Sequence, residues 1–295
     1  MTTPLAEGGP AGGPTVLRML LGAHLRRLRE AQGVTREEAG WEIRASESKI
    51  SRMELGRVSF KERDIADLLT LYEVADLEER ARLLALARDA NTPGWWHRFG
   101  DVLPSWFHSY LGLEAAASLI RTYELQFVPG LLQTSDYARA VVMLAHGSAR
   151  SEDVERRVSL RMARQQILTR ENPVQLWAVV DEAALRRPIG GPKVMRAQLE
   201  TLIELTQLPS VRLQIMPFDA GGHAAAGGSF SILRFPDGDL PDVVYVEQLN
   251  SALYLDKAED VEQYTEAMER LCIDAKPPTQ TTRILEQILR TFTER

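Results

Sequence analysis

The segment that most constrains the fold comprises residues 35–57. Thr35, with Glu38 three positions later, forms a capping-box pattern and predicts the start of a short helix. Ser46 is a good N-cap for a second short helix, which should end before Gly56. So few residues separate the two helices that a tight turn must join them. The second helix carries small polar and basic residues on one side and apolar residues on the other, so it can pack with one face and meet a partner with the other.

Apolar residues at helical spacing predict three more helices, at residues 16–32, 61–72 and 77–90. Five helices in so short a stretch predict a compact all-α domain over residues 16–92. Residues 1–15 are rich in glycine and proline and are expected to be a disordered lead.

A larger second domain is expected after Pro93 and Gly94, which break the helical pattern. Residues 93–278 alternate predicted strands with predicted helices, which is typical of an α/β or α+β domain. Residues 279–295 are expected to form a C-terminal helix. The expected strands are 119–127, 174–181, 211–217, 229–235 and 243–247, and the expected helices are 134–146, 151–170, 192–207 and 258–274.

Charge and composition narrow the function classes. The chain has 295 residues, 44% of them hydrophobic, and a net charge of −6, so it is not a general polycation. Residues 18–57 nevertheless carry nine Lys and Arg against six Glu, a local excess of positive charge. Cys272 is the only cysteine, which excludes an internal disulfide and fits a reducing compartment. With no apolar run of membrane-spanning length and no signal-peptide pattern, we expect a cytoplasmic protein.

The exposed face of the helix after Ser46 has the chemistry of a reader of DNA bases. Lys49 and Arg52 could donate to guanine, Glu47 could accept from cytosine, and Ser48 can do either. Ile50 falls on the opposite face and is expected in the core.

Residues 46–57 resemble the helix-turn-helix signature of the Xre/Cro/C1 family of bacterial and phage regulators. The resemblance implies an ion pair between Arg29 and Glu54 and a phosphate contact by Arg36. Arg57, just past the second of the two short helices, is another candidate for a backbone contact. It also implies a homodimer on a pseudo-palindromic double-stranded DNA operator. Arg44 departs from the family pattern, because many relatives have glycine at this place in the turn.

The rest of the chain resembles the effector-like domain of actinobacterial Xre regulators of the Scr1/WhiJ-like family. The resemblance rests on several motifs in order, among them GWWHRFGDVLPSWFHSYLGLEAAA, YELQFVPGLLQTSDYARA, VVDEAALRRPIGG and LPSVRLQIMPFDAGGHAAAGGSFSIL. It implies a transcriptional regulator whose C-terminal domain senses a partner protein or a small ligand. The partner it implies is a small acidic BldB-like protein encoded nearby. The alternative is an antitoxin-like protein that sequesters this partner, with DNA binding only autoregulatory.

The sequence offers little to support an enzyme. His223 lies in a glycine-rich loop and could act as an acid or base or contact a ligand, although a plain connection between strands is the simpler interpretation. Arg186 and Arg187 are either a solvated surface or a contact for an acidic partner. Asp181 and Glu182 follow a predicted strand and are interpreted as helix caps. The chain lacks the spacing of a metal site or a catalytic motif, so we expect no enzyme activity, no metal and no cofactor.

Overall fold

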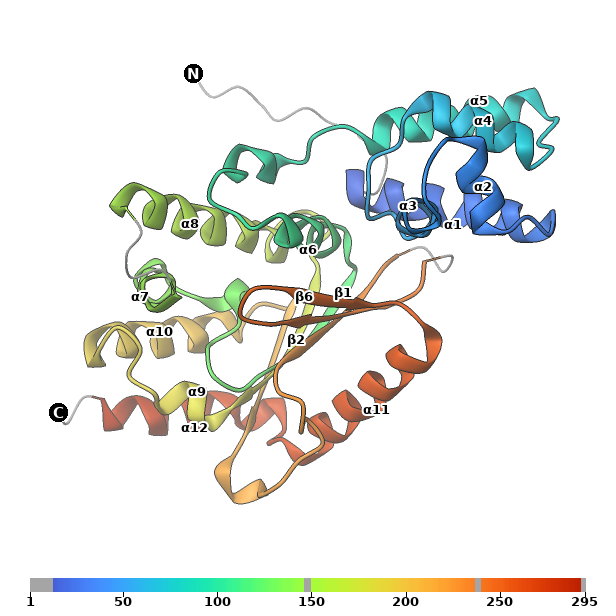
Figure 1. The fold of residues 1–295 in the computed structure, drawn as a ribbon. Coiled ribbons are helices and arrows are strands. Elements are labelled where there is room, and N and C mark those ends of the chain that lie inside the picture. Colours follow the sequence, from blue (N-terminus) through green and yellow to red (C-terminus); the bar gives the residue numbers. More distant parts are fainter. Residues whose placement is uncertain (1–12, 146–149, 237–239, 293–295) are drawn as a thin grey trace. The chain divides into compact units, whose positions relative to one another are not determined.

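The computed structural model describes residues 13–145, 150–236 and 240–292 (Figure 1). The expected disordered lead therefore lies mostly outside the described residues. The described chain divides into two compact units. One holds the described residues up to His97 with His108–Ala116 and Leu240, and the other holds the remainder. The expected fold class, an all-α N-terminal domain and a larger domain with helices and a mixed sheet, is confirmed.

The first unit contains the predicted five-helix arrangement. Its helices are α1 (Pro14–Ala31), α2 (Arg36–Glu42), α3 (Glu47–Glu54), α4 (Glu62–Leu71) and α5 (Leu77–Ala90). Both predicted caps are present: Thr35 Oγ1 and Ser46 Oγ accept hydrogen bonds from backbone N–H groups in the first turns of α2 and α3. The carboxylate of Asp76 caps α5 in the same way. At Thr35 the capping box is complete, since Glu38 accepts from the Thr35 backbone N–H at 2.7 Å.

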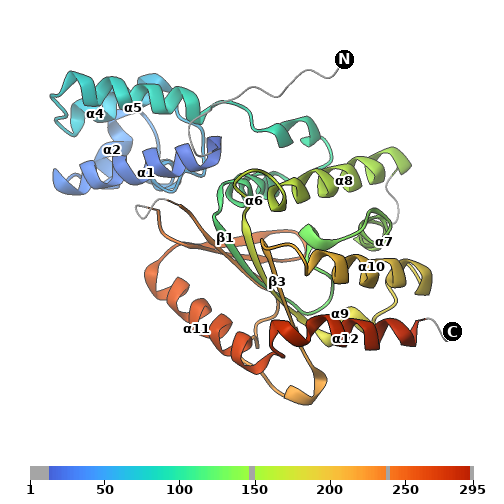
Figure 2. The same ribbon diagram turned by 180° about the vertical axis from the view of Figure 1, so that it is seen from behind.

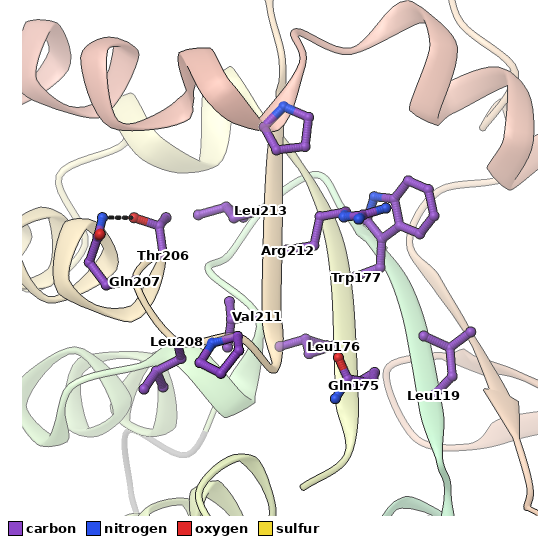
Figure 3. A pocket seen from close by; sticks show the side chains of 12 residues that line it. Leu119, Gln175, Leu176, Trp177, Thr206, Gln207, Leu208, Val211, Arg212 and Leu213 are labelled. Atoms are coloured by element: carbon purple, nitrogen blue, oxygen red, sulfur yellow. Dashed lines mark hydrogen bonds between the residues drawn. The ribbon is translucent and has the colours of Figure 1, made fainter.

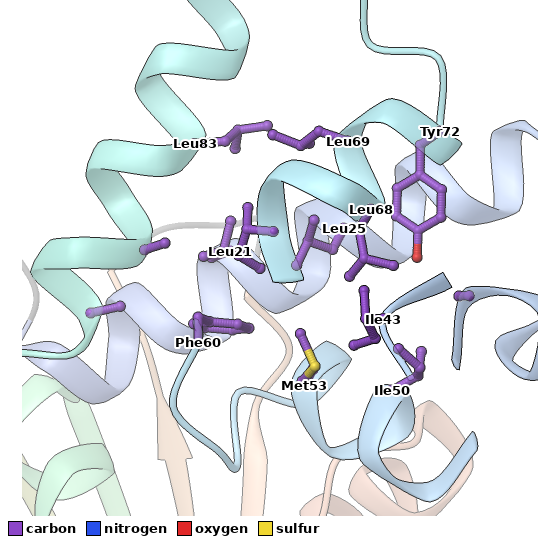
Figure 4. Close-up of a cluster of buried hydrophobic side chains, with 14 of the residues drawn as sticks. Leu21, Leu25, Ile43, Ile50, Met53, Phe60, Leu68, Leu69, Tyr72 and Leu83 are labelled. Atoms are coloured by element: carbon purple, nitrogen blue, oxygen red, sulfur yellow. The ribbon is translucent and has the colours of Figure 1, made fainter. Parts of the chain in front are cut away.

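A single apolar cluster joins these helices (Figure 4). Side chains converge on it from α1, α3, α4 and α5, including Leu21, Leu25, Ile50, Met53, Leu68, Leu69 and Leu83. Gly40 lets α2 and the start of α3 approach closely, because a Cβ there would lie 2.7 Å from the carbonyl oxygen of Ala45. Full burial of this cluster is the main term that holds five short helices together.

The second unit is built on a six-stranded sheet with the order β3-β2-β1-β4-β5-β6. The strands β1, β2 and β3 are parallel to one another, and β4, β5 and β6 continue the sheet in antiparallel fashion. The strand bounds are β1 (Leu119–Glu124), β2 (Gln175–Asp181), β3 (Val211–Met216), β4 (Phe230–Arg234), β5 (Val243–Glu247) and β6 (Ala252–Leu255).

Helices cover both faces of this sheet, as Figures 1 and 2 show from opposite sides. The helix α11 (Ala258–Asp274) packs on one face, where Met268 and Leu271 join a buried cluster with Tyr123 and Val179. On the other face lie α10 (Pro192–Leu205) and α12 (Pro278–Thr291), which contact each other. The remaining helices of the chain are α6 (Ser105–Ala116), α7 (Ser135–Ala145), α8 (Ser151–Arg164) and α9 (Glu182–Arg186), with 3₁₀ turns at Trp95–Phe99, Gly130–Leu132, Gln165–Leu168 and Phe218–Ala220.

Several boundaries differ from the sequence-based expectation. The helix expected at residues 151–170 is α8 followed by a separate 3₁₀ turn, so the regular helix ends at Arg164. The strand expected at 119–127 ends at Glu124, where the chain turns away and Leu125 becomes exposed. Both α6 and β6 were not expected. The segment of α6 is apolar nearly all round, and β6 is a short edge strand of only four residues.

Candidate nucleic-acid interface

The tight turn between α2 and α3 contains the one departure from the family pattern. Arg44 adopts φ = 55°, in the left-handed region that glycine occupies most easily. The turn is closed by backbone bonds from Arg44 N to the carbonyl of Trp41 at 3.1 Å and from Ala45 N to that of Gly40 at 2.8 Å. A non-glycine residue therefore sustains the turn, at a cost in backbone strain.

Behind α3, a buried carboxylate links three helices. Glu54 is 5% exposed and accepts from Arg29 on α1 at 2.5 Å and 3.2 Å. A second guanidinium, that of Arg36 at the start of α2, donates from Nε to Glu54 Oε2 at 3.0 Å, the oxygen that also accepts from Arg29 Nη2. The hydrogen bond to Glu54 raises the pKa of Arg29. Glu54 thereby holds Arg36 at the N-terminus of α2, where its side chain stays one-third exposed.

The outward face of α3 presents the residues singled out from the sequence. Glu47, Ser48 and Arg52 are exposed, whereas Ile50 is buried on the opposite side. Arg52 Nε donates to the carbonyl of Ser48 at 3.2 Å, so its guanidinium lies along the helix surface.

Lys49 is not free on this face. Its Nζ lies 2.6 Å from Asp64 Oδ2 on α4, and both side chains are partly buried. Sequence reasoning missed Asp64, because a contact between two helices leaves no periodic signal in the chain. Arg57, exposed just after α3, completes the set of basic residues around the helix pair.

Two family models match this chain. Residues 107–287, more than half of its length, match the family described as Domain of unknown function (DUF5753). The chain belongs to the DUF5753 family. Residues 20–83 match a model described as Helix-turn-helix domain, which covers the α2–turn–α3 arrangement and its supporting helices. Comparisons with curated proteins and with solved structures found no match.

The protein thus carries a helix-turn-helix domain, a type that binds DNA, followed by a DUF5753 domain. Within the described ranges, none of its helices combines the length and apolar character that a bilayer span needs.

The DUF5753 domain places His223 in a small polar cluster at the carboxyl ends of β1 and β2. The Tyr123 hydroxyl lies 3.0 Å from His223 Nε2 and donates to Asp181 Oδ2 at 3.4 Å. Asp181 also caps α9 by accepting from Ala183 N at 2.8 Å, as interpreted from the sequence. Burial raises the pKa of Tyr123, which disfavours a phenolate. The cluster ties the glycine-rich loop to the sheet.

Arg186 and Arg187 lie apart from this cluster. Arg186 donates to Glu182 within α9 at 2.6 Å, and Arg187 is exposed after that helix. In the part of the chain that the structure describes, no hydrogen bond or ion pair joins either arginine to His223. Across the same residues, no group of three or more His, Cys, Asp or Glu side chains is placed to hold a metal ion.

Proposed function

We propose that this protein is a sequence-specific transcriptional regulator that binds double-stranded DNA as a homodimer. Residues 16–92 are its DNA-reading domain, and residues 93–278 are its effector and dimerisation domain, which acts by binding rather than by catalysis. The observation that carries the proposal is the helix-turn-helix domain, whose α3 presents polar and basic side chains on the face opposite its apolar contacts.

The proposed roles follow from chemistry and position. Arg52, Lys49, Glu47 and Ser48 contact base edges in the major groove, where guanidinium and ammonium groups pair with guanine and a carboxylate pairs with cytosine. Arg36 and Arg57 contact phosphates and set the register of the domain on the duplex. The ion pair with Glu54 supports the role of Arg36, because a positioned guanidinium loses little freedom on binding.

A dimer would read two half-sites of a pseudo-palindromic operator, one helical turn apart. The DUF5753 domain would then regulate by linkage. A partner protein or ligand that binds one arrangement of the two helix-turn-helix domains more tightly than another changes operator affinity by at most that difference in binding free energy.

The sequence resemblance supports a narrower proposal: an Xre-type, Scr1/WhiJ-like regulator from an actinobacterium that acts in the cytoplasm on the nucleoid, with a small BldB-like protein as its partner. Co-expression with the small acidic neighbour tests this. A stoichiometric complex that alters operator binding supports it, whereas toxicity of the neighbour relieved by this chain favours the antitoxin-like alternative.

The test of DNA reading begins with selection of binding sites from random duplexes by the full chain. We expect a pseudo-palindromic consensus. The Arg52→Ala variant should lose about 1–3 kcal/mol at that site and relax its preference at one position of each half-site. Arg196→Ala, which removes an exposed arginine of α10, is the matched control. Wild-type affinity and discrimination by Arg52→Ala would contradict the proposed placement of α3.

A further inference from the structure

A pocket of about 490 Å³ lies at the N-terminal ends of β2 and β3 in the DUF5753 domain (Figure 3). Its volume falls within the range of small-molecule sites. Trp177 and Arg212 form one wall, and Thr206, Gln207 and Leu208 line it on the other side of β3. Nothing in the helix-turn-helix domain contributes to it.

Strand register creates a row of three side chains, of which Trp177 and Arg212 line the pocket and Arg121 lies beside them. Arg121 on β1, Trp177 on β2 and Arg212 on β3 are direct neighbours across the parallel strands. The guanidinium carbons of Arg121 and Arg212 lie 5.6 Å and 4.6 Å from the centre of the Trp177 ring, so the indole has a cation on either side.

Hydrogen bonds hold this wall in place. The Trp177 Nε1–H donates to Gln214 Oε1 at 2.7 Å. Gln214 Nε2 in turn donates to the backbone carbonyls of Cys272 and Lys276 at 3.0 Å and 3.1 Å. The indole is therefore fixed before any ligand arrives, and its position in turn fixes the stacked guanidiniums.

Among the described residues, no carboxylate pairs with either of the two guanidiniums. Across the described ranges of the chain, neither Arg121 nor Arg212 forms an ion pair. Arg121 Nε is buried without a hydrogen-bond partner, whereas Arg212 is exposed and lines the pocket. Arg212 therefore offers the pocket a guanidinium without an ion-pair partner, and Arg121 adds positive charge from the far side of Trp177; both favour a bound anion.

The edge of β3 beside the pocket is closed to an added strand. The carbonyl of Leu213 accepts from Thr281 Oγ1 at 2.6 Å, and that of Ile215 accepts from Lys276 N at 3.0 Å. Because these edge groups are already used, recognition of an extended peptide by strand addition is disfavoured. Pro278, the first residue of α12, also lines the pocket, so the N-terminus of that helix, with its partial positive charge, lies close to it.

We propose that this pocket binds a small organic anion, whose carboxylate or phosphate is held by the forked guanidinium of Arg212 beside Trp177. The proposal deepens the sensing role proposed above, on which its regulatory meaning rests, and names the chemistry of the ligand. Leu208 and Val211 supply apolar surface for the rest of the ligand, and Gln175 and Gln207 offer amide groups in the same lining.

The test is a calorimetric titration of the full chain, without DNA and at constant ionic strength. The probes are benzoate, phenyl phosphate and, as a neutral match, benzyl alcohol. We expect saturable binding of at least one anion with one site per chain, and binding of benzyl alcohol at least tenfold weaker. The stronger of the two anions distinguishes a carboxylate ligand from a phosphate ligand.

The Arg212→Gln variant should weaken anion binding at least tenfold, and Arg212→Lys, which keeps the charge but not the fork, should fall between that variant and the wild type. The control Arg196→Gln removes an exposed arginine that pairs with Glu200 on α10, and it should bind as the wild type does. Failure of both anions to saturate, or unchanged binding by Arg212→Gln, would overturn the proposal. Operator binding is measured separately. If the chain binds its selected operator but no anion, the ligand proposal fails and the proposed regulatory function stands.

Discussion

The first unit, which is helical, and the second unit, which holds the sheet, differ in whether their buried charged groups have ion-pair partners. In the helical unit, Glu54 lies between Arg29 and Arg36, and each of the three side chains has a charged partner. In the sheet unit, Arg121 and the partly buried Glu124 form no ion pair within the described residues. The carboxyl group of Glu124 is hydrogen-bonded to Ser229. Desolvation raises its pKa by more than Arg161 and Arg164 lower it by attracting its negative charge through space.

The difference separates two uses of charge. A compensated buried carboxylate fixes geometry, and around Glu54 it fixes the side chain proposed to contact a phosphate. A charged group without an ion-pair partner instead leaves a net charge, which a bound proton or a bound counter-ion can neutralise. The predictions below test this comparison, from the largest expected effect to the smallest.

Removing the charge of Glu54 should have the largest effect. The Glu54→Gln variant leaves the buried guanidinium of Arg29 with only the exposed Glu30, 3.4 Å away, as a counter-charge. We expect a loss of about 3–5 kcal/mol in the free energy of unfolding. Urea unfolding of the full chain, followed by circular dichroism, measures it. The control Asp67→Asn breaks the looser, solvent-facing pair with Arg63 on α4 and should cost less than about 1 kcal/mol. Equal losses of stability in the two variants would show that the buried charge of Glu54 contributes no more than the exposed charge of Asp67.

Glu124 should make stability depend on pH in the opposite sense to an ion-paired carboxylate. Desolvation raises its pKa from 4.5 to about 7 in the folded chain. The folded state therefore holds its proton more tightly, so this stabilisation is complete below pH 4.5 and is lost as the pH rises toward 7.

We expect that loss to be about 1–3 kcal/mol, visible as the difference in urea unfolding between Glu124→Gln and the wild type across this pH range. The control Glu204→Gln removes an exposed carboxylate of α10 and should leave the pH dependence unchanged. A wild-type contribution from Glu124 that grows with pH would contradict the assignment.

Breaking the Lys49–Asp64 pair should strengthen DNA binding. Asp64→Asn frees the ammonium group and removes a negative charge close to α3, and we expect operator affinity to rise by about 1 kcal/mol, with a steeper dependence on salt. Fluorescence anisotropy at several salt concentrations measures both quantities. Asp67→Asn, on the same helix but paired with Arg63 rather than with Lys49, is again the control. Weaker binding by Asp64→Asn would instead show that Asp64 positions Lys49.

The smallest effect concerns backbone rather than charge. Arg44→Gly relieves the left-handed strain in the turn, and we expect thermal unfolding to show a gain of about 0.5–1 kcal/mol. Arg44→Val should destabilise, because a branched side chain fits this conformation poorly. A loss of stability in Arg44→Gly would mean that the Arg44 side chain contributes more than the strain costs.

The same two units also differ in how far the sequence could predict them. Local features of the first unit were predictable, because each depends on residues only a few positions apart. These are the helix caps at Thr35, Ser46 and Asp76 and the core position of Ile50. The row of Arg121, Trp177 and Arg212 was not, because it depends on the register of three strands that lie far apart in the chain. For the same reason the Lys49–Asp64 pair and the Tyr123–His223 contact appear only in the folded structure.

The central claim is that α3 lies along base edges, and guanine N7-methylation interference on the selected operator tests it most directly. For the wild type we predict interference at symmetric guanines in the two half-sites, and for Arg52→Ala the loss of interference at one guanine of each half-site. Arg36→Ala should weaken binding without changing the pattern, since a phosphate contact carries no base preference. An identical interference pattern for Arg52→Ala and the wild type, together with equal affinity, would contradict the account.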